Sequence, residues 1–234
     1  MLGALRVALE ARCSSEEALS CVGCATDGDL LRALRARKND ERAAVELVIQ
    51  EKIWRRENLP VNEDNEKMLK VRARNVAYIV HAPDYEGRSV VMTITARHDR
   101  SEVQFEEGEA FGLWLVEHTI SHAQRFGHEQ FTLIFDLAGF GWAQMDLPLA
   151  RRMNELLVQS YPERLGKCLL LNAPFVFSSF YALVSPFIDQ STRERIVFVR
   201  DLAQLHEFVP REHLPTEYGG PRDLEIDVKR TYNA

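Results

Sequence analysis

The chain has 234 residues, of which 46% are hydrophobic and 27% are charged, and its formal net charge is -6 at pH 7. This composition is that of an ordinary globular protein with ample length for a core, which excludes a disordered or fibrous chain. The acidic balance also argues against a nucleic-acid-binding protein, because neutralising phosphates requires a basic face.

The cysteines and the hydropathy pattern bear on where the protein works. Cys13, Cys21, Cys24 and Cys168 lack the regular spacing of a disulfide framework, so we expect a reducing compartment. The Cys21 and Cys24 pair is also typical of a redox site or half a zinc site, but no second ligand pair stands at suitable spacing, and we favour two ordinary thiols. No window reaches the length of a membrane span, and the N-terminal segment has no convincing signal-peptide cleavage site. We therefore expect a soluble, cytoplasmic protein that touches membranes transiently.

The first part of the chain predicts a small helical domain at residues 27–74. Before it, residues 1–26 have no clear cap, and we expect a frayed helix or disorder there. Asp27-Gly-Asp29 and Asn39-Asp40 are typical helix caps, and the apolar residues that follow the second cap repeat at helical spacing. The pattern predicts helices over residues 30–38, from Asp40 to Leu59, and over residues 63–73.

From residue 75 to residue 222 the pattern changes to alternating strands and helices, which predicts an α/β fold with a mixed sheet. The turn from Asp84 to Arg88 makes the first two strands a hairpin at the sheet edge. We expect strands over residues 76–80, 89–96, 131–135, 168–171 and 196–199, helices over residues 106–126 and 147–160, a helix that begins at Asp201, and a tail over residues 223–234.

Candidate catalytic residues are few. His118 and His122 stand four residues apart on one helix face, but Thr119 occupies the position where a zinc hydrolase carries its glutamate. Asp136 ends a strand, where α/β enzymes often place an acid, yet no nucleophile or second carboxylate accompanies it, and we favour a turn-capping role. There is no nucleophile elbow and no phosphate-binding glycine loop. We predict no catalytic residue, no metal and no cofactor; the alternative is a hydrolase that uses Asp136 and a histidine.

The stretch from Tyr161 to Ile188 is the most informative part of the chain. A polar turn (YPERLGK) leads into an apolar strand, which breaks at Asn172-Ala173-Pro174. The segment that follows is apolar on nearly every face, so it is buried in the core, which is the default, or it lines a pocket. Its large apolar side chains include Phe175, Phe177, Phe180, Tyr181, Val184 and Phe187.

This ordered set of motifs resembles the CRAL-TRIO lipid-binding family, in which Tyr-Pro-Glu-Arg, a hydrophobic strand, Asn-Ala-Pro and an aromatic helix follow one another. The resemblance covers about residues 27–222 and includes LLRALRARK (30–38), LIFDLAG (133–139) and LPTEYGG (214–220). It implies the CRAL-TRIO fold: a mixed sheet with helices that enclose a hydrophobic pocket, preceded by a small helical domain. With it, we favour the pocket for the aromatic segment.

The resemblance also implies roles for particular residues. The helix after Asn-Ala-Pro is the gate of the family's lipid pocket, here about residues 178–187, and Gly166 and Gly219-Gly220 are candidate hinges. The positions that match the family's phosphoinositide headgroup site are Arg37, Lys38, Glu163, Arg164, Thr192 and Arg195. Cationic groups and a hydroxyl suit phosphate oxygens, although arginine at 195, where the family has lysine, changes the reach of the charge.

Two departures from the family pattern concern the cargo. Phe131 and Leu133 replace the small hydroxylated residues that serve a choline headgroup, so we do not expect phosphatidylcholine to bind in that mode. Ala138 replaces a lysine in the family's Asp-Leu-Lys-Gly turn, which removes one basic group.

We therefore predict a monomeric, non-enzymatic carrier that binds a phospholipid, with phosphatidylinositol as the expected cargo, and exchanges it between membranes or presents it to a lipid kinase. Each buried methylene gains about 0.8 kcal/mol, so one acyl chain of about sixteen carbons gains on the order of 10 kcal/mol. One alternative is a carrier of another hydrophobic ligand, such as a retinoid, tocopherol, a squalene-like lipid or haem. Another is a scaffold or regulator that binds a protein partner such as a small GTPase.

Overall fold

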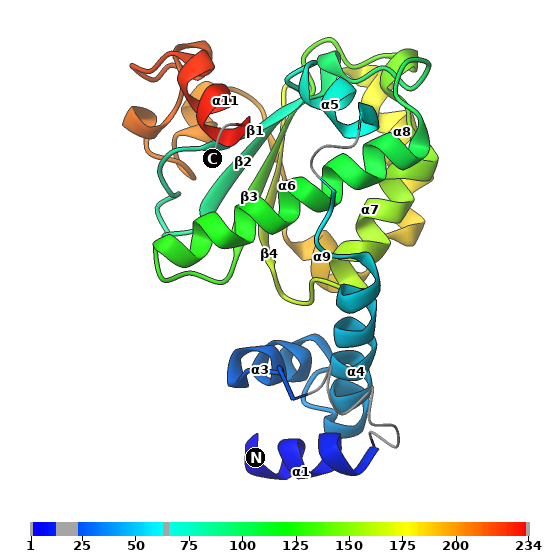
Figure 1. The fold of residues 1–234 in the computed structure, drawn as a ribbon. Coiled ribbons are helices and arrows are strands. Elements are labelled where there is room, and N and C mark those ends of the chain that lie inside the picture. The colour runs from blue at the N-terminus through cyan, green and yellow to red at the C-terminus, as the bar shows by residue number, and fades with distance from the viewer. Residues whose placement is uncertain (1, 13–22, 63–65, 233–234) are drawn as a thin grey trace. The chain divides into compact units, whose positions relative to one another are not determined.

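The computed structural model describes residues 2–12, 23–62 and 66–232, and it divides the chain into two compact units (Figure 1). The first unit, called the helical unit below, comprises residues 1–61 and 155–163. The second, called the sheet unit, comprises residues 62–154 and 164–234.

Before residue 62, the described part of the helical unit forms the helices α1 (Leu2–Arg12), α3 (Asp27–Ala36) and α4 (Glu41–Asn58). Thr26 caps α3 through a capping box with Asp29, and the Asp40 side chain accepts the hydrogen bond of the Ala43 amide at the start of α4. Lys52 Nζ lies 2.8 Å from Asp29 Oδ2. Because Asp29 lies in the first turn of α3 and Lys52 lies in the second half of α4, this ion pair joins the start of α3 to the later part of α4.

Helix α1 corrects our expectation of a frayed helix over residues 2–12. Leu5 and Leu9, one turn apart, are only 1% and 2% exposed and pack into the same apolar core as Leu30 and Leu34 of α3. A short helix without a clear cap is marginal alone, so this tertiary packing stabilises it. The helical unit therefore begins before residue 27. The rest of that expectation, from residue 13 to residue 22, lies outside the described residues.

The sheet unit contains five strands in the order β1-β2-β3-β4-β5. Strands β1 and β2 form the expected antiparallel hairpin, whereas β2 to β5 are parallel and are connected by crossovers that contain helices. The strands are β1 (Ala77–Val80), β2 (Ser89–Ile94), β3 (Phe131–Asp136), β4 (Leu165–Leu171) and β5 (Ile196–Val199). The fold class is thus the mixed α/β architecture expected from the sequence.

The helices of this part of the chain run from α5 to α11. They are α5 (Glu66–Arg72), α6 (Phe105–Arg125), α7 (Leu147–Gln159), α8 (Phe175–Val184), α9 (Gln190–Glu194), α10 (Leu202–Leu205) and α11 (Leu224–Tyr232). Short 3-10 turns are η1 (Thr95–Arg97), η2 (Trp142–Gln144), η3 (Ser185–Phe187), η4 (Arg211–His213) and η5 (Thr216–Tyr218). Helix α5 belongs to the sheet unit, not to the helical domain where we placed it, because it packs against α6.

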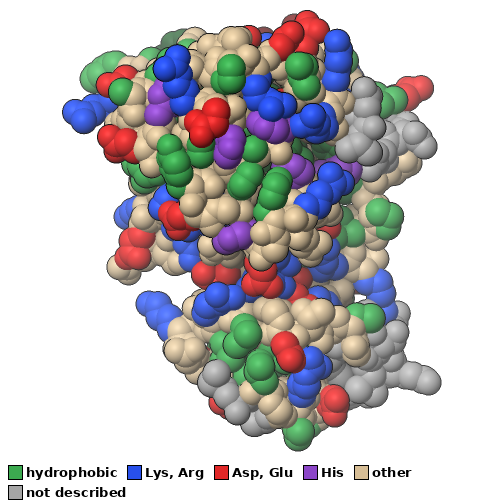
Figure 2. Space-filling view, turned by 90° about the vertical axis from the view of Figure 1, so that its left-hand side faces the viewer, with side chains coloured by type: hydrophobic (Ala, Val, Ile, Leu, Met, Phe, Trp, Pro, Cys, Tyr) green, Lys and Arg blue, Asp and Glu red, His purple; other side chains and the backbone are tan. Residues whose placement is uncertain are grey.

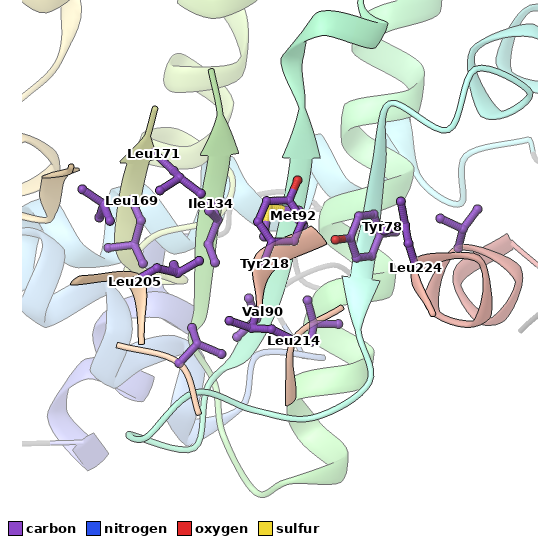
Figure 3. Close-up of a cluster of buried hydrophobic side chains, with 14 residues drawn as sticks. Tyr78, Val90, Met92, Ile134, Leu169, Leu171, Leu205, Leu214, Tyr218 and Leu224 are labelled. Atoms are coloured by element: carbon purple, nitrogen blue, oxygen red, sulfur yellow. The ribbon is translucent and has the colours of Figure 1, made fainter. Parts of the chain in front are cut away.

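One face of the sheet is sealed by the C-terminal segments. Every strand contributes to a continuous core whose members are at most 9% exposed. In Figure 3, Tyr218 lies over Met92 while Leu205 and Leu214 lie over the same face. Alternate residues of a strand point to the same face, so this core accounts for one face only.

Helix α6 covers part of the opposite face, where it contacts β2 and β3. It also packs closely against α7, because Gly108 and Gly112 stand one turn apart on the contact face. A Cβ at Gly108 would lie 2.7 Å from Leu149 Cδ2, and one at Gly112 would lie 2.7 Å from the Met153 side chain. The two helices therefore approach closely at both glycines, and a larger residue at either position would require the Leu149 or Met153 side chain to move.

Helix α11 replaces the tail that we expected over residues 223–234. It covers the edge of β1, where the Thr231 hydroxyl accepts a 2.8 Å hydrogen bond from the Ile79 amide and the Tyr232 hydroxyl donates to the Ala77 carbonyl. Leu224 and Val228 on the same helix join the sheet core. An uncovered edge strand is a template for pairing with other chains, so α11 closes a vulnerable edge.

Replacing Thr231 with valine is expected to destabilise the sheet unit. The change keeps the shape but leaves the buried Ile79 amide without its acceptor, which costs about 1–3 kcal/mol. Urea unfolding measures the loss, with Thr216→Val on an exposed turn as the matched control. Equal unfolding midpoints for Thr231→Val and the control would show that α11 does not depend on this bond.

Candidate functional site

The second face of the sheet is incompletely covered over β3, β4 and β5. Phe135, Leu170 and Phe198 are aligned across these strands, and on the same face Leu133 is aligned with Cys168. Leu170 and Cys168 are buried, but Phe135 and Leu133 are only partly buried and Phe198 is 48% exposed. An apolar sheet face that its own chain does not fully cover is a candidate ligand surface.

Helix α8 lies against this face through aromatic side chains. The rings of Phe177 and Tyr181 lie 6.5 Å and 5.4 Å from that of Phe198 on β5. Phe140, in the loop after β3, lies 5.1 Å from Phe177 and 5.3 Å from Phe180. These spacings are typical of favourable edge and tilted ring contacts, so an aromatic cluster joins α8 to the sheet.

The candidate gate residues fall on two sides of α8 and of the turn η3 that follows it. Phe177, Phe180 and Val184 are buried and Tyr181 is partly buried, which places four of the predicted side chains on the inner side. Phe175 is 92% exposed and Phe187 is 49% exposed. The helix is therefore neither core throughout nor pocket lining throughout: its outer side presents apolar groups to the surroundings.

Three of the candidate headgroup residues gather at the amino ends of β4 and β5. Arg164 directly precedes β4 and donates to the Glu129 carbonyl at 3.0 Å. Arg195 directly precedes β5, and its Nη1 donates to the Leu165 carbonyl at 2.6 Å. The Arg195 amide also donates to the Thr192 carbonyl at 3.1 Å. The structure thus brings two guanidinium groups and one hydroxyl residue to the same end of the sheet.

The other three candidates belong to the helical unit. Arg37 and Lys38 form the turn before α4, whereas Glu163 follows Tyr161, whose ring lies 5.7 Å from that of Trp54 near the end of α4. At 1.5 Å per residue, Trp54 lies about 20 Å along α4 from its start. Within this unit, α4 therefore separates Arg37 and Lys38 from the turn that leads to Glu163.

The candidate hinge glycines have local structural explanations. Phe131 and Thr132 of β3 pair with Leu165 and Lys167, so Gly166 is the extra residue of a bulge in β4. Glycine is favoured at such bulges. Gly219 has a φ of 81°, in the left-handed region that favours glycine. Their role as hinges stays a prediction.

Asp136 has the turn-capping role that the sequence favoured. Its carboxylate accepts hydrogen bonds from the Ala138 amide at 3.1 Å, from Asn172 at 3.0 Å and from the Tyr218 hydroxyl at 2.9 Å. These bonds fix the carboxyl ends of β3 and β4 to the C-terminal segments, and they occupy the carboxylate with structural partners.

Several histidines lie among basic and apolar side chains on the face of the sheet unit in Figure 2. His206 and His213 donate to the Tyr218 and Pro83 carbonyls, and His81 accepts a hydrogen bond from Arg222 at 2.6 Å. Burial, and then the nearby Arg222 charge, lower the pKa of His81 to about 4. Within the described ranges, no group of three or more His, Cys, Asp or Glu side chains is arranged to hold a metal ion.

Sequence reasoning missed several residues around α8. Phe140, Trp142 and Phe198 belong to short segments that carry no family motif, although the alternation of β5 places Phe198 on the face opposite the sealed core. Trp142 is 75% exposed. Arg151 and Asn154 of α7 both contact Phe187. In the sequence, Arg151 and Asn154 have the spacing of polar residues on any amphipathic helix, so only the structure identifies their contact with Phe187.

Comparison with known proteins identifies the family. A model of the CRAL/TRIO domain family matches residues 73–220, which is more than half of the chain. The crystal structure of Sfh5 has the same fold, with a TM-score of 0.70 over 97% of this chain and 87% of that chain, at 18% sequence identity.

Curated relatives match most of the chain. The SEC14 cytosolic factor of Eremothecium gossypii is 31% identical over 85% of this chain and 70% of its own length. The phosphatidylinositol transfer protein CSR1 of the same organism is 28% identical over 94% of this chain, and a CRAL-TRIO domain-containing protein of Schizosaccharomyces pombe is 27% identical over 83%. The chain spans about half the length of these last two relatives, 53% and 46% respectively. Every helix in the described part of the chain is too short or too polar to cross a membrane.

The Asp189 cap at the start of α9 predicts a pH dependence. Partial burial acts to raise the pKa of Asp189, but hydrogen bonds from the Thr192 hydroxyl and nearby amides prevail and lower it. A lowered carboxyl pKa contributes stability that is present above the unfolded pKa of 3.8 and is lost as the pH falls through the folded value. Thr192→Val should raise the pKa of Asp189 toward 3.8, so the cap is lost at higher pH.

Carboxyl-carbon NMR titration of Asp189 measures this change. Ser191→Ala is the control, because it keeps the backbone amide that also contacts Asp189. An Asp189 pKa that is the same in wild type and Thr192→Val would contradict the assigned hydrogen bond.

Proposed function

Because the chain belongs to the CRAL-TRIO domain family, whose members bind or transfer lipids, we propose that it carries a phospholipid between membranes. The observation that carries this proposal is the apolar face of β3, β4 and β5, which α8 covers only in part. We propose that acyl chains occupy the space between this face and α8, and that α8 is the gate through which they enter and leave.

The chemistry of the partly covered face suits acyl chains. Leu133, Phe135 and Phe198 present apolar atoms, and the thiol beside them, Cys168, is neutral because burial raises its pKa to about 12. Burial of each methylene gains about 0.8 kcal/mol, so even half of a sixteen-carbon chain contributes on the order of 6 kcal/mol. This gain needs no catalysis and no cofactor.

For the cargo we propose phosphatidylinositol, with its phosphate at the amino ends of β4 and β5. Arg164 and Arg195 bring two cationic groups to that end, and charge-assisted hydrogen bonds to phosphate are among the strong ones. The name of the matching CSR1 protein assigns phosphatidylinositol transfer to that relative, which supports the same cargo here. The headgroup roles expected for Arg37, Lys38 and Glu163, which belong to the helical unit, stay a prediction.

For the membrane contact we propose the surface formed by η2 and the start of α8. Trp142 and Phe175 are 75% and 92% exposed. The contact of Phe140 with Phe177 joins the loop after β3 to the first turn of α8, which follows the carboxyl end of β4. Tryptophan and phenylalanine suit the boundary between headgroups and acyl chains. The exposed apolar side chains thus belong to the start of the proposed gate helix and to the neighbouring turn, where the gate would contact a membrane.

Removing the charge of Arg195 is expected to weaken phosphatidylinositol binding at least tenfold, since a hydrogen bond to a charged group contributes about 1.5–3 kcal/mol. Arg195→Gln retains a side-chain donor for the Leu165 carbonyl, Arg195→Lys retains the charge, and Arg125→Gln on the exposed end of α6 is the control. Native mass spectrometry after incubation with mixed liposomes identifies the bound lipid and its loss.

The lipid outcomes separate the alternatives. One phosphatidylinositol, reduced in Arg195→Gln but retained in Arg195→Lys and the control, supports carrier and headgroup site together. A lipid bound equally by all four proteins keeps the carrier and discards this site. A protein that stays lipid-free contradicts the carrier and favours an interaction module with a protein partner. A double change of Arg37 and Lys38 to glutamine tests the helical unit separately.

Replacing Trp142 and Phe175 together with serine should lower partition onto phospholipid vesicles at least tenfold, because burying one large apolar side chain contributes about 1.5–3 kcal/mol. Vesicle co-sedimentation measures this partition. The control is Tyr85→Ser, which removes a 64% exposed aromatic from the hairpin turn. Equal losses in the variant and the control would contradict the assigned membrane surface.

A further inference from the structure

The end of the aromatic segment is tied to α7 by two side chains. Asn154 Nδ2 donates a 2.9 Å hydrogen bond to the Phe187 carbonyl, and the guanidinium carbon of Arg151 lies 3.7 Å from the centre of the Phe187 ring. Arg151 and Asn154 are three residues apart on α7, so they share one helix face. Both contacts therefore hold the same residue from the same side.

The rest of this segment is held mainly by apolar contacts. The rings of Phe177 and Phe180 contact the ring of Phe140, and Arg193 donates to the Ser185 and Ile188 carbonyls. Arg193 belongs to α9, directly after the segment, so its bonds stabilise the turn locally. Contacts from α7 are different, because they join the segment to another helix, which itself packs closely against α6 at Gly108 and Gly112.

We propose that Arg151 and Asn154 form a latch on Phe187, and that the phosphate groups of a membrane surface release it by binding Arg151. Arg151 is exposed although it covers the ring, and Phe187 and Leu183 are 49% and 56% exposed. A guanidinium group binds phosphate through charge-assisted hydrogen bonds, which are stronger than an exposed contact with a phenyl ring. At a phospholipid surface, Arg151 therefore leaves the Phe187 ring and binds phosphate instead.

The latch gives the proposed gate a reason to open at a membrane and to stay closed elsewhere. One exposed hydrogen bond and one exposed cation–π contact together favour the closed position by roughly tenfold. That bias is small enough for a surface to overcome. The role of the latch in gating rests on the proposed lipid transfer. The contacts that form the latch do not depend on that proposal, so the first measurement is made without lipid.

Hydrogen exchange over residues 175–188 tests the latch in the full chain. Arg151→Ala and Asn154→Ala should each speed exchange in this segment roughly threefold and the double variant roughly tenfold, with Arg125→Ala unchanged. Arg151→Lys keeps a cation and should exchange at a rate between wild type and Arg151→Ala. Exchange in the double variant equal to that of wild type would overturn the latch, whether or not the protein carries lipid.

Alkylation of Cys168 by N-ethylmaleimide tests the release, because this buried thiol lies on the sheet face that α8 partly covers. Vesicles of phosphatidylcholine and phosphatidylserine should speed alkylation of the wild type to the rate seen in the double variant. The same vesicles should not speed alkylation of the double variant. Phosphate-free galactolipid vesicles should leave the wild type slow. Equal acceleration by galactolipid vesicles, or by inorganic phosphate alone, would overturn release by a phospholipid surface.

Discussion

The seal that the C-terminal segments place over one face of the sheet is the constraint on which the rest of the structure depends. Tyr218 and Leu214 lie over the strands, and α11 covers the edge of β1. Buried side chains from the strands and from these segments pack together over that face. The opposite face over β3, β4 and β5 is then the side on which apolar atoms stay partly uncovered, and its covering helix α8 is the natural place for a gate.

The parallel strands also separate two chemistries in space. All carboxyl ends of β2 to β5 lie at one end of the sheet and all amino ends at the other. Arg164 and Arg195 stand at the amino ends, whereas the exposed Trp142 and Phe175 stand beyond the carboxyl ends. At about 3.3 Å per residue, β4 separates the two by roughly 20 Å. In the proposed carrier, the headgroup site and the membrane contact would therefore lie about one strand length apart, which suits an amphipathic cargo.

Much of this fold could be predicted from the sequence, because short apolar runs bounded by turn residues specify buried strands. The strand at Phe131, the helix that ends before Gly127 and the cap at Asp40 are each local signals. Helix α11 was not expected, and α1 was expected only as a frayed helix or disorder, because tertiary contacts and not local signals stabilise these two helices. In the sequence, nothing distinguishes Thr231 from an ordinary surface residue. Its role depends on β1 being an edge strand, whose amides need an acceptor.

The candidate site was predictable in part, where local sequence signals place its residues. Motif order located the aromatic segment and the residues around Arg195, since these lie close in sequence to the strands that place them. It could not tell that α4 separates Lys38 from Tyr161 within one unit, because helix length and direction decide that. Nor could it divide the aromatic segment into an inner side with Phe177 and an outer side with Phe175.

That division explains how a helix with so many apolar residues avoids exposing one continuous apolar patch. Ser178, Ser179 and Ala182 separate the exposed Phe175 from Leu183, so the outer apolar groups are spread along the helix. The Arg151 side chain covers the ring of Phe187 at the far end. A cation over an aromatic ring keeps apolar surface from water while adding charge. The same residue that shields the segment in solution is the one that phosphates can attract, and shielding and release are therefore two states of a single contact.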